Sequence, residues 1–372
     1  MIKGNALVRL EEVINDFAIS GCLEDIAPLG KGHINDTFVS KWNLGGSVMR
    51  YTHQRINSKV FAHPDEVMQN ISRVTGHIES KLAAANVKDR DRRVLTVIPG
   101  RDGKPWTRDS EGGWWRTYRF IEGSRTVDIA STPMEAELLG RSVGQFQKQL
   151  ADLEGERLFE TIPDFHNMET RYLNFHNVLE KDEYNRAKDA KPEIDFLLEN
   201  EERGGILIRE MRAGSIPERI CHNDTKLSNI LLDEKDNSAL CVIDLDTVMP
   251  GSSLFDLGDL IRTVTITAAE DEMDIGKVRF DSVFFEALLK GYLSSALDFL
   301  VPEEKKLLCE SGRNLTQIMC LRFCTDYLSG DHYYHTSRPG HNLDRCRTQF
   351  ALIHSMDEQW KTAEEIVRKF IY

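Results

Sequence analysis

Apolar residues recur along the chain with two different periods. Residues 6–19 and 64–86 carry apolar side chains three and four positions apart, a spacing typical of helices with one buried face. Three further segments alternate or form short apolar runs and are predicted to be strands: residues 47–57, 92–100 and 112–121. Helical spacing dominates after residue 126. The sequence therefore predicts an α+β fold, with sheet and helices first and mainly helices afterwards.

A polar, glycine-bearing connector follows the last of these strands, with the sequence IEGSRT at residues 121–126. A chain of 372 residues fits two lobes better than one. We therefore expect a nucleotide-binding lobe at 1–122 and a catalytic, acceptor-binding lobe at 123–372. Backbone groups of Glu122 and Gly123 would then lie where a hinge holds an adenine ring, although any loop between lobes would look the same.

The densest group of polar residues surrounds a predicted hairpin. Two apolar runs, Ile230–Leu232 and Leu240–Ile243, enclose a polar turn and read as short buried strands. Asp224 precedes the first run, Asn229 follows Asp224 by five positions, and Asp244 ends the second run. The pattern is HxDxxxxN, one hairpin, then DxD. Its Asp and Asn spacing matches the catalytic loop of protein kinases.

These residue types are those that phosphoryl transfer requires. The reaction needs Mg²⁺ to offset phosphate charge and a residue that orients the acceptor hydroxyl. Mg²⁺ prefers oxygen ligands and keeps several waters, so Asn229 and Asp244 would suffice as protein ligands. Asp224 would accept the hydroxyl proton, a role that contributes a factor of about 10²–10⁴. Each half of the motif alone is often a solvated turn, whereas the combination is specific.

Four segments carry a resemblance to known families. CHNDTKLSNILLDE and VIDLDTVMPG resemble the aminoglycoside phosphotransferase and choline kinase superfamily. With GHINDTF and LRFCTDYLSGDHYY, they resemble more narrowly the N-acetylhexosamine 1-kinases, over residues 29–347. The resemblance implies a protein-kinase-like fold, with a smaller N-terminal lobe containing an antiparallel sheet and helices and a larger, mainly helical C-terminal lobe. It also implies ATP with Mg²⁺, and phosphorylation of the anomeric hydroxyl of N-acetylglucosamine or N-acetylgalactosamine. Asp36, Arg322 and Tyr333 match positions that contact the sugar.

Two features bear on phosphate binding. Gly30 and Gly32 lie in a predicted hairpin loop whose backbone N–H groups can approach phosphates, although an ordinary turn has the same composition. The strand at 47–57 lacks the lysine that kinases place there and offers Arg55 instead. Arg55 would either contact phosphates or face solvent, because a planar guanidinium does not simply replace an ammonium.

Composition narrows the possible partners. The formal net charge of −13 disfavours a nucleic-acid partner, which would require a basic surface. No apolar run approaches the roughly 20 residues that span a bilayer, and the first residues lack a secretion signal. We therefore expect a cytoplasmic protein with a small-molecule sugar substrate and no membrane partner. Nothing implies an oligomer, and seven cysteines without a CxxC pair indicate neither a disulfide framework nor a zinc site.

Two alternatives stay open. The acceptor would be an aminoglycoside, choline or another small alcohol if acidic residues lined the acceptor site, which the net charge permits. The arginine-rich segment 322–347 argues against this. A pseudokinase would explain the missing strand lysine. The intact set of Asp224, Asn229 and Asp244 argues for turnover instead.

Overall fold

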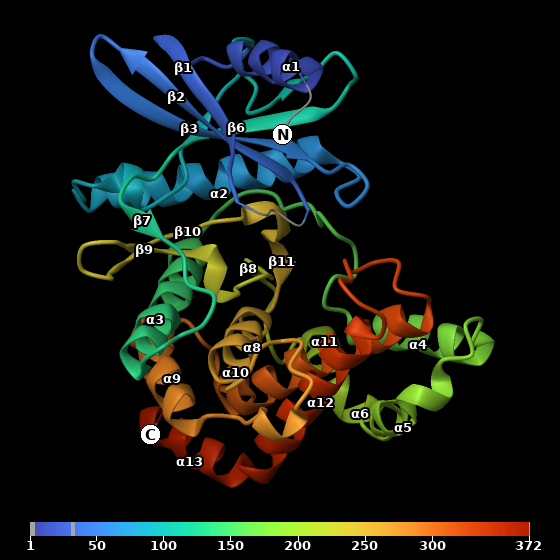
Figure 1. The fold of residues 1–372 in the computed structure, drawn as a ribbon. Coiled ribbons are helices and arrows are strands. Elements are labelled where there is room, and N and C mark those ends of the chain that lie inside the picture. The colour runs from blue at the N-terminus through green and yellow to red at the C-terminus, as the bar shows by residue number, and fades with distance from the viewer. Residues whose placement is uncertain (1–3, 31–33, 372) are drawn as a thin grey trace. The chain divides into compact units, whose positions relative to one another are not determined.

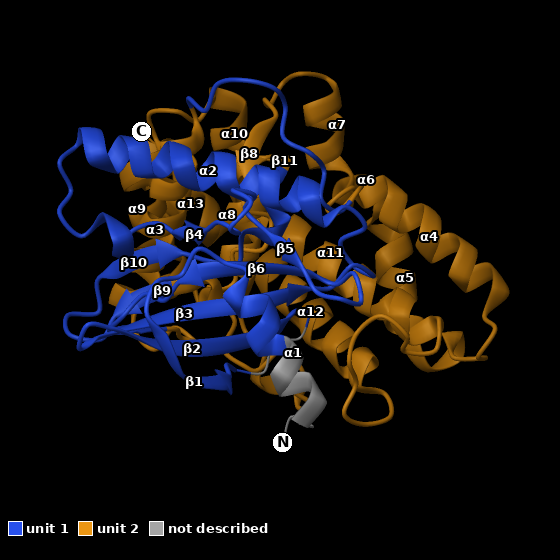
Figure 2. Cartoon of the chain, turned by 90° about the horizontal axis from the view of Figure 1, so that it is seen from above, with its two compact units in different colours: residues 1–125, 152–162, 231–249 blue, residues 126–151, 163–230, 250–372 orange. Residues whose placement is uncertain are grey.

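The computed structural model describes residues 4–30 and 34–371. The chain divides into two compact units, each built from three segments (Figure 2). The first unit comprises residues 1–125, 152–162 and 231–249, and the second comprises residues 126–151, 163–230 and 250–372. The predicted division at residue 122 stays a prediction.

An antiparallel six-stranded sheet dominates the first unit, as predicted (Figure 1). Its order is β1-β2-β3-β6-β4, and β5 also pairs with β6. The strands are β1 (Cys22–Pro28), β2 (Asp36–Leu44), β3 (Ser47–Ile56), β4 (Val97–Ile98), β5 (Thr107–Arg108) and β6 (Trp114–Arg119). The predictions for residues 47–57 and 112–121 are confirmed by β3 and β6.

The predicted strand at residues 92–100 is wrong for most of its length. Only Val97–Ile98 pairs with β6, and the preceding residues form a short 3-10 helix, η1 (Arg90–Arg92). Arg92 donates to the Asp233 carboxylate, and Arg93 donates to the Ala239 carbonyl. These two arginine side chains connect the segment to the later hairpin. The segment therefore contacts the hairpin through guanidinium groups and not through backbone strand pairing.

Two helices pack in this unit. α1 (Gly4–Asn15) places Leu10, Val13 and Ile14 in a core with Trp42 and Trp115 of the sheet. α2 (Pro64–Ala84) begins with a proline at its first turn, where no helical N–H partner is lost. The apolar face of α2 predicted from the sequence is buried: Val67, Ile71, Val74 and Ile78.

A single amide on α2 joins the separate segments of the first unit. The buried Asn70 side chain donates to the carbonyls of Phe159 (2.8 Å) and Val248 (3.0 Å), and its oxygen accepts from the Phe159 backbone N–H. The bond to the buried Val248 carbonyl offsets the cost of burying that group, and the two bonds with Phe159 hold a partly exposed segment. They explain why residues 152–162 and 231–249 belong with the sheet.

The hairpin predicted from the sequence is confirmed. β9 (Ile230–Asp233) pairs with β10 (Ala239–Val242) and, on its other side, with β7 (Ser124–Arg125). β10 is followed by the 3-10 helix η4 (Leu245–Thr247).

Helices make up most of the second unit (Figure 1). They are α3 (Pro133–Leu150), α4 (Met168–Lys181), α5 (Lys191–Glu199), α6 (Glu201–Gly204), α7 (Ile206–Arg212), α8 (Ser253–Val264), α9 (Ser282–Ala296), α10 (Pro302–Lys306), α11 (Leu308–Leu328), α12 (His341–Glu358) and α13 (Trp360–Ile371). Short 3-10 helices are η2 (Ala187–Ala190), η3 (Leu227–Asn229) and η5 (Ile275–Lys277), and β8 (Arg219–Cys221) pairs with β11 (Met249–Gly251). No helix in the described part of the chain is long and apolar enough to cross a membrane.

Glycines set the closest helix contact of this unit, between α3 and α9. A Cβ on Gly291 would lie 1.9 Å from the Glu137 carbonyl oxygen, and one on Gly140 would lie 2.1 Å from that of Leu288. No side chain fits at either position, so the two backbones pack directly against each other. The contacts at these two glycines fix the position of α3, which carries residues that support the site.

A buried polar chain crosses the sheet of the first unit. The His53 ring hydrogen-bonds the hydroxyls of Ser40 (2.7 Å) and Thr117 (2.8 Å), and the Trp42 indole N–H donates to Ser40 (2.9 Å). Burial lowers the pKa of His53 to about 3, so the folded protein keeps this ring neutral.

This burial predicts loss of stability in mild acid. The unfolded imidazole binds a proton near pH 6.5, whereas the folded one stays neutral until about pH 3, so stability falls as pH drops between these values. We expect His53→Gln to reduce the pH dependence of the unfolding free energy by up to about 1.4 kcal/mol per pH unit. Urea unfolding at pH 7 and pH 5 measures it, with the exposed His335→Gln as the control. Equal slopes for His53→Gln and the native chain would contradict the prediction.

Candidate active site

The loop that carries Asp224 is held by one buried carboxylate. Asp256 of α8 accepts hydrogen bonds from the backbone N–H groups of His222 (3.0 Å) and Asn223 (2.6 Å). The Thr225 hydroxyl donates to the Asp256 carbonyl at 2.6 Å. Asn223 adopts a left-handed conformation with φ of 64°, which turns the chain immediately before Asp224. The sequence pattern alone gives no sign of this turn.

Further contacts hold the supporting groups in place. Gln147 of α3 donates to Asp256 at 2.9 Å, and the Tyr292 hydroxyl donates to Gln147 at 2.7 Å. Burial raises the pKa of Asp256, although these donors oppose the shift. On the other side of the loop, Nε2 of His166 donates to the Asn223 carbonyl at 2.9 Å. Burial lowers the pKa of His166 to about 3, so it acts as a neutral donor.

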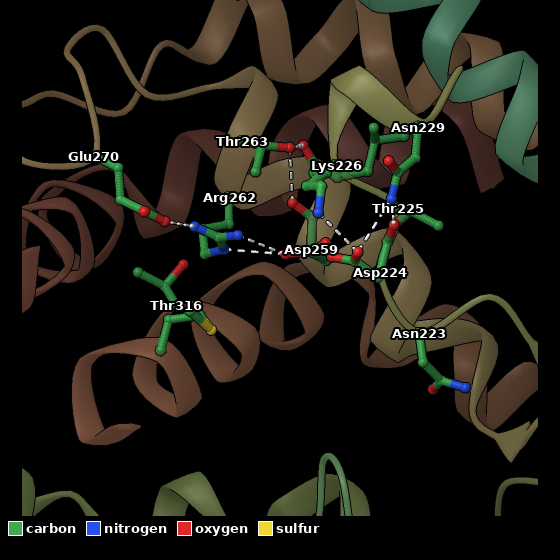
Figure 3. A network of polar contacts seen from close by, with 12 residues as sticks. Asn223, Asp224, Thr225, Lys226, Asn229, Asp259, Arg262, Thr263, Glu270 and Thr316 are labelled. Carbon is green, nitrogen blue, oxygen red and sulfur yellow. Dashed lines mark hydrogen bonds and ion pairs between the residues drawn. The ribbon is translucent and has the colours of Figure 1, made fainter. Parts of the chain in front are cut away.

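Asp224 itself is partly exposed, with 31% of its side chain accessible. The Lys226 ammonium lies 2.9 Å from Oδ2, and Nδ2 of Asn229 donates to the same oxygen at 3.1 Å (Figure 3). Nδ2 also donates to the Asp224 carbonyl at 2.9 Å. Burial opposes ionisation, but Lys226 and Asn229 outweigh it and lower the pKa of Asp224. The residue is therefore a carboxylate at neutral pH, ready to accept a hydrogen bond from a hydroxyl.

The second half of the motif lies in the first unit. Asp244 follows β10 in a left-handed conformation, with φ of 61°, and begins η4. Asp246 is buried and fully used, because it pairs with the Arg116 guanidinium and accepts from Nδ2 of Asn35 at 2.7 Å. Of the DxD pair, Asp246 therefore has a structural role.

Sequence reasoning missed Arg116, which is 1% exposed at the middle of β6. Its Nε donates to Gln54 at 2.9 Å, and burial disfavours its charge, but Asp246 outweighs the burial and raises the pKa of Arg116. An arginine inside the apolar run WWRTYRF is the signal that could have found it, since a buried cation requires a carboxylate.

The donor set fits a hard divalent cation. Asn229 directs its amide N–H₂ to Asp224 and so keeps Oδ1 for another partner, while Asp244 contributes a carboxylate. Among residues 4–30 and 34–371, no three His, Cys, Asp or Glu side chains form a metal-binding group. Mg²⁺ needs few protein ligands, because it keeps most of its waters. Asn229 lies in the second unit and Asp244 in the first, so their joint binding of one ion stays a prediction.

The residues predicted to contact phosphates lie in the first unit. Gly30 has a positive φ of 71°, as a tight turn requires, whereas Gly32 lies outside the described residues. Nε of Arg55 lies 3.3 Å from the Asp109 carboxylate, and 40% of the Arg55 side chain is exposed. Phosphate contacts of these residues stay predictions.

The predicted adenine contacts involve a connector with partners of its own. The Glu122 carboxylate pairs with Arg50, and its carbonyl accepts from Nε of Arg92 at 3.1 Å. The Gly123 carbonyl accepts from Nη2 of Arg92 at 3.2 Å and from the Glu234 backbone N–H at 3.0 Å. An adenine contact of Glu122 and Gly123 stays a prediction.

Two of the three predicted sugar-binding residues meet in one cavity. Arg322 of α11 and Tyr333 line a hollow of about 330 Å³ in the second unit, together with Arg171, Thr325, Asp326 and Tyr334. Nη2 of Arg322 lies 3.5 Å from the Tyr333 hydroxyl. Burial opposes the charge of Arg322, but Tyr334 and Tyr333, with a smaller contribution from Asp224, outweigh the burial and raise the pKa of Arg322. The third residue, Asp36, is exposed at the start of β2 in the first unit, opposite Arg55.

Comparison with known proteins settles the family. Residues 25–296 match the family described as "Phosphotransferase enzyme family". The chain belongs to this phosphotransferase family. It is therefore a member of a family of phosphoryl-transferring enzymes, and the motif around Asp224 lies within the matched region.

Solved structures of such enzymes share the kinase-like fold. An aminoglycoside phosphotransferase from Alicyclobacillus acidocaldarius matches with a TM-score of 0.61 at 11% identity, over 96% of each chain. A spectinomycin phosphotransferase in complex with ADP and spectinomycin gives 0.55 at 12% identity, over 96% of this chain and 99% of that chain. An ethanolamine kinase from Plasmodium vivax gives 0.52 at 16% identity, over 93% and 85%. The predicted kinase-like α+β fold is confirmed.

The Asp256 contacts generate a prediction about the loop. The backbone N–H groups of His222 and Asn223 point to different oxygens of Asp256, so the N–H₂ group of Asp256→Asn would face one of these donors. Leaving a buried donor unsatisfied costs about 1–3 kcal/mol. We expect faster hydrogen exchange at the amides of His222 and Asn223 and reduced turnover. Hydrogen exchange read by mass spectrometry or NMR measures this, with the exposed Asp298→Asn as the control. Unchanged protection of both amides would show that Asp256 does not hold the loop.

Proposed function

We propose that this phosphotransferase transfers the γ-phosphoryl group of ATP to the anomeric hydroxyl of an N-acetylhexosamine, such as N-acetylglucosamine or N-acetylgalactosamine. The observation that carries the proposal is the cavity with Arg322 and Tyr333, which lies in the same unit as Asp224. The family membership supports phosphoryl transfer, and the cavity supports the choice of acceptor.

Asp224 would orient the anomeric hydroxyl and accept its proton as the bond to phosphorus forms. Its lowered pKa makes it a weak base in the ground state, so its main contribution is to position the hydroxyl, with proton transfer late in the step. Lys226 and Asn229 fix the Oδ2 side of the carboxylate. Oδ1 of Asp224 has no hydrogen-bond partner within the described ranges and is the oxygen we assign to the acceptor.

Asn229 and Asp244 would hold Mg²⁺, which offsets the negative charge of the phosphates when bound. Gly30 and Gly32 would offer backbone N–H groups to the phosphates, with Arg55 as an additional cation. The connector at Glu122 and Gly123 would hold the adenine ring through its backbone.

The sugar would be held by groups suited to hydroxyls and ring faces. Arg322 donates in a planar fork to oxygen atoms, and the exposed ring of Tyr333 offers an apolar face to the C–H side of a sugar. Asp36 would accept from sugar hydroxyls. A cationic acceptor of the aminoglycoside or choline type fits less well, because two arginines line the cavity.

The role of Asp224 can be tested directly. We expect Asp224→Asn to fold normally and to lose a factor of about 10²–10⁴ in kcat, because it cannot accept the hydroxyl proton. Coupled ADP release measures turnover, and Asp195→Asn on the exposed face of α5 is the matched control. Near-normal kcat in Asp224→Asn would falsify the assignment.

The acceptor can be tested on the native enzyme. We expect ADP release with N-acetylhexosamines and a phosphorus NMR spectrum that places phosphate on the anomeric carbon. Turnover of choline or an aminoglycoside, with none of N-acetylhexosamines, would replace the proposed acceptor with a cationic alcohol.

A further inference from the structure

Two guanidinium groups line the proposed acceptor cavity. Arg171 comes from α4 and Arg322 from α11, and both line the same hollow of about 330 Å³. Burial lowers the pKa of Arg171, and the positive charge of Arg322 lowers it further. The two positive charges that line this cavity therefore repel each other.

Neither guanidinium has an acidic partner. Across the residues that the structure describes, no carboxylate lies within ion-pair distance of Arg171 or Arg322. Arg171 donates only to the Phe165 carbonyl at 2.8 Å, and its Nε is buried without a partner. Arg322 lies against the rings of Phe165, Tyr333 and Tyr334. Arg203 and Arg313 of the same unit, by contrast, both pair with Asp357.

The nearby acids are already occupied. Both oxygens of Asp326 are used by the backbone N–H groups of residues 332–334 and by Nδ2 of Asn342. Asp164 is exposed and accepts from Nδ2 of Asn167, and Asp224 pairs with Lys226. Because these carboxylates are held by other groups, neither guanidinium forms an ion pair within the described residues, and both keep N–H donors for a ligand.

We propose that the preferred acceptor is an N-acetylhexosamine with an added anionic substituent, a carboxylate or a phosphate, which is bound between Arg171 and Arg322. The inference rests on the proposed function, because it assigns the anion to the acceptor of that same site. The buried Tyr334 hydroxyl, which also has no partner in the described part of the chain, supplies a further donor at the cavity.

Charge balance is the physical reason. A neutral sugar would leave two partly desolvated cations facing each other, whereas a carboxylate or phosphate accepts paired N–H bonds from a guanidinium and removes the repulsion. The same arrangement rejects ammonium-bearing acceptors, because a third positive charge would enter the cavity.

The experiment compares three acceptors with the native enzyme: a neutral N-acetylhexosamine, the same sugar bearing a carboxylate substituent, and the same sugar bearing a phosphate away from the anomeric carbon. We expect kcat/KM for at least one anionic sugar to exceed that of the neutral sugar by about tenfold or more, the gain from one charge-assisted contact. The two anionic arms decide between carboxylate and phosphate.

Variants of Arg171 test the assignment to residues. Arg171→Met should lower kcat/KM for the anionic sugar about tenfold more than for the neutral sugar and so remove the preference, and Arg171→Lys should keep part of it because the charge remains. The exposed Arg368→Gln on α13 is the matched control. Since the native enzyme alone reveals the preference, the test stands even if Arg171→Met does not fold.

Two outcomes would overturn the inference and leave the proposed function standing. One is equal use of neutral and anionic sugars by the native enzyme. The other is a rise in KM for ATP in Arg171→Met with unchanged sugar preference, which would assign the arginine to the nucleotide. Turnover of choline or an aminoglycoside alone would instead contradict both proposals.

Discussion

The candidate site depends on a buried carboxylate whose hydrogen bonds are made with the protein itself. Asp256 accepts the backbone N–H groups of His222 and Asn223, and so fixes the turn that presents Asp224. A buried charge is expensive unless donors surround it, and here the donors are the loop itself and the side chain of Gln147. Loop and carboxylate therefore stabilise each other, and neither is well placed without the other.

A similar arrangement occurs beside the second aspartate of the motif. Asp246 lies two positions after Asp244 and is held by Arg116 and Asn35 within the first unit. In both units, then, a fully bonded buried aspartate fixes the backbone near an aspartate proposed to act in the chemistry. Because Asp246 and Asp256 are already bonded to the protein, few of the acidic residues near the motif are available to a ligand.

The sequence predicted those parts whose signal is local. The spacing of Asp224 and Asn229, the hairpin that follows and the apolar face of α2 all come from patterns shorter than about one helix or hairpin. Arg116 was missed because its partner lies far along the chain. Arg116 pairs with a residue 130 positions away, a separation that leaves no periodic trace.

The strand predicted at residues 92–100 failed for a related reason. The segment does contain an apolar run, but Arg92 and Arg93 form hydrogen bonds with the later hairpin. These long-range contacts override the local preference for a strand. The contacts that support the loop were not predictable from local sequence patterns, because Asp256 and His166 lie 33 and 57 positions away from Asn223 in the chain.

Asn70 gives the first unit a mechanical property. Its one side chain joins α2 to the backbone at Phe159 and at Val248, four residues beyond Asp244. A displacement of α2 would therefore be transmitted to the segment that bears Asp244 without passing through the sheet. An uncharged side-chain amide thus couples the position of the helix to that of the backbone near Asp244.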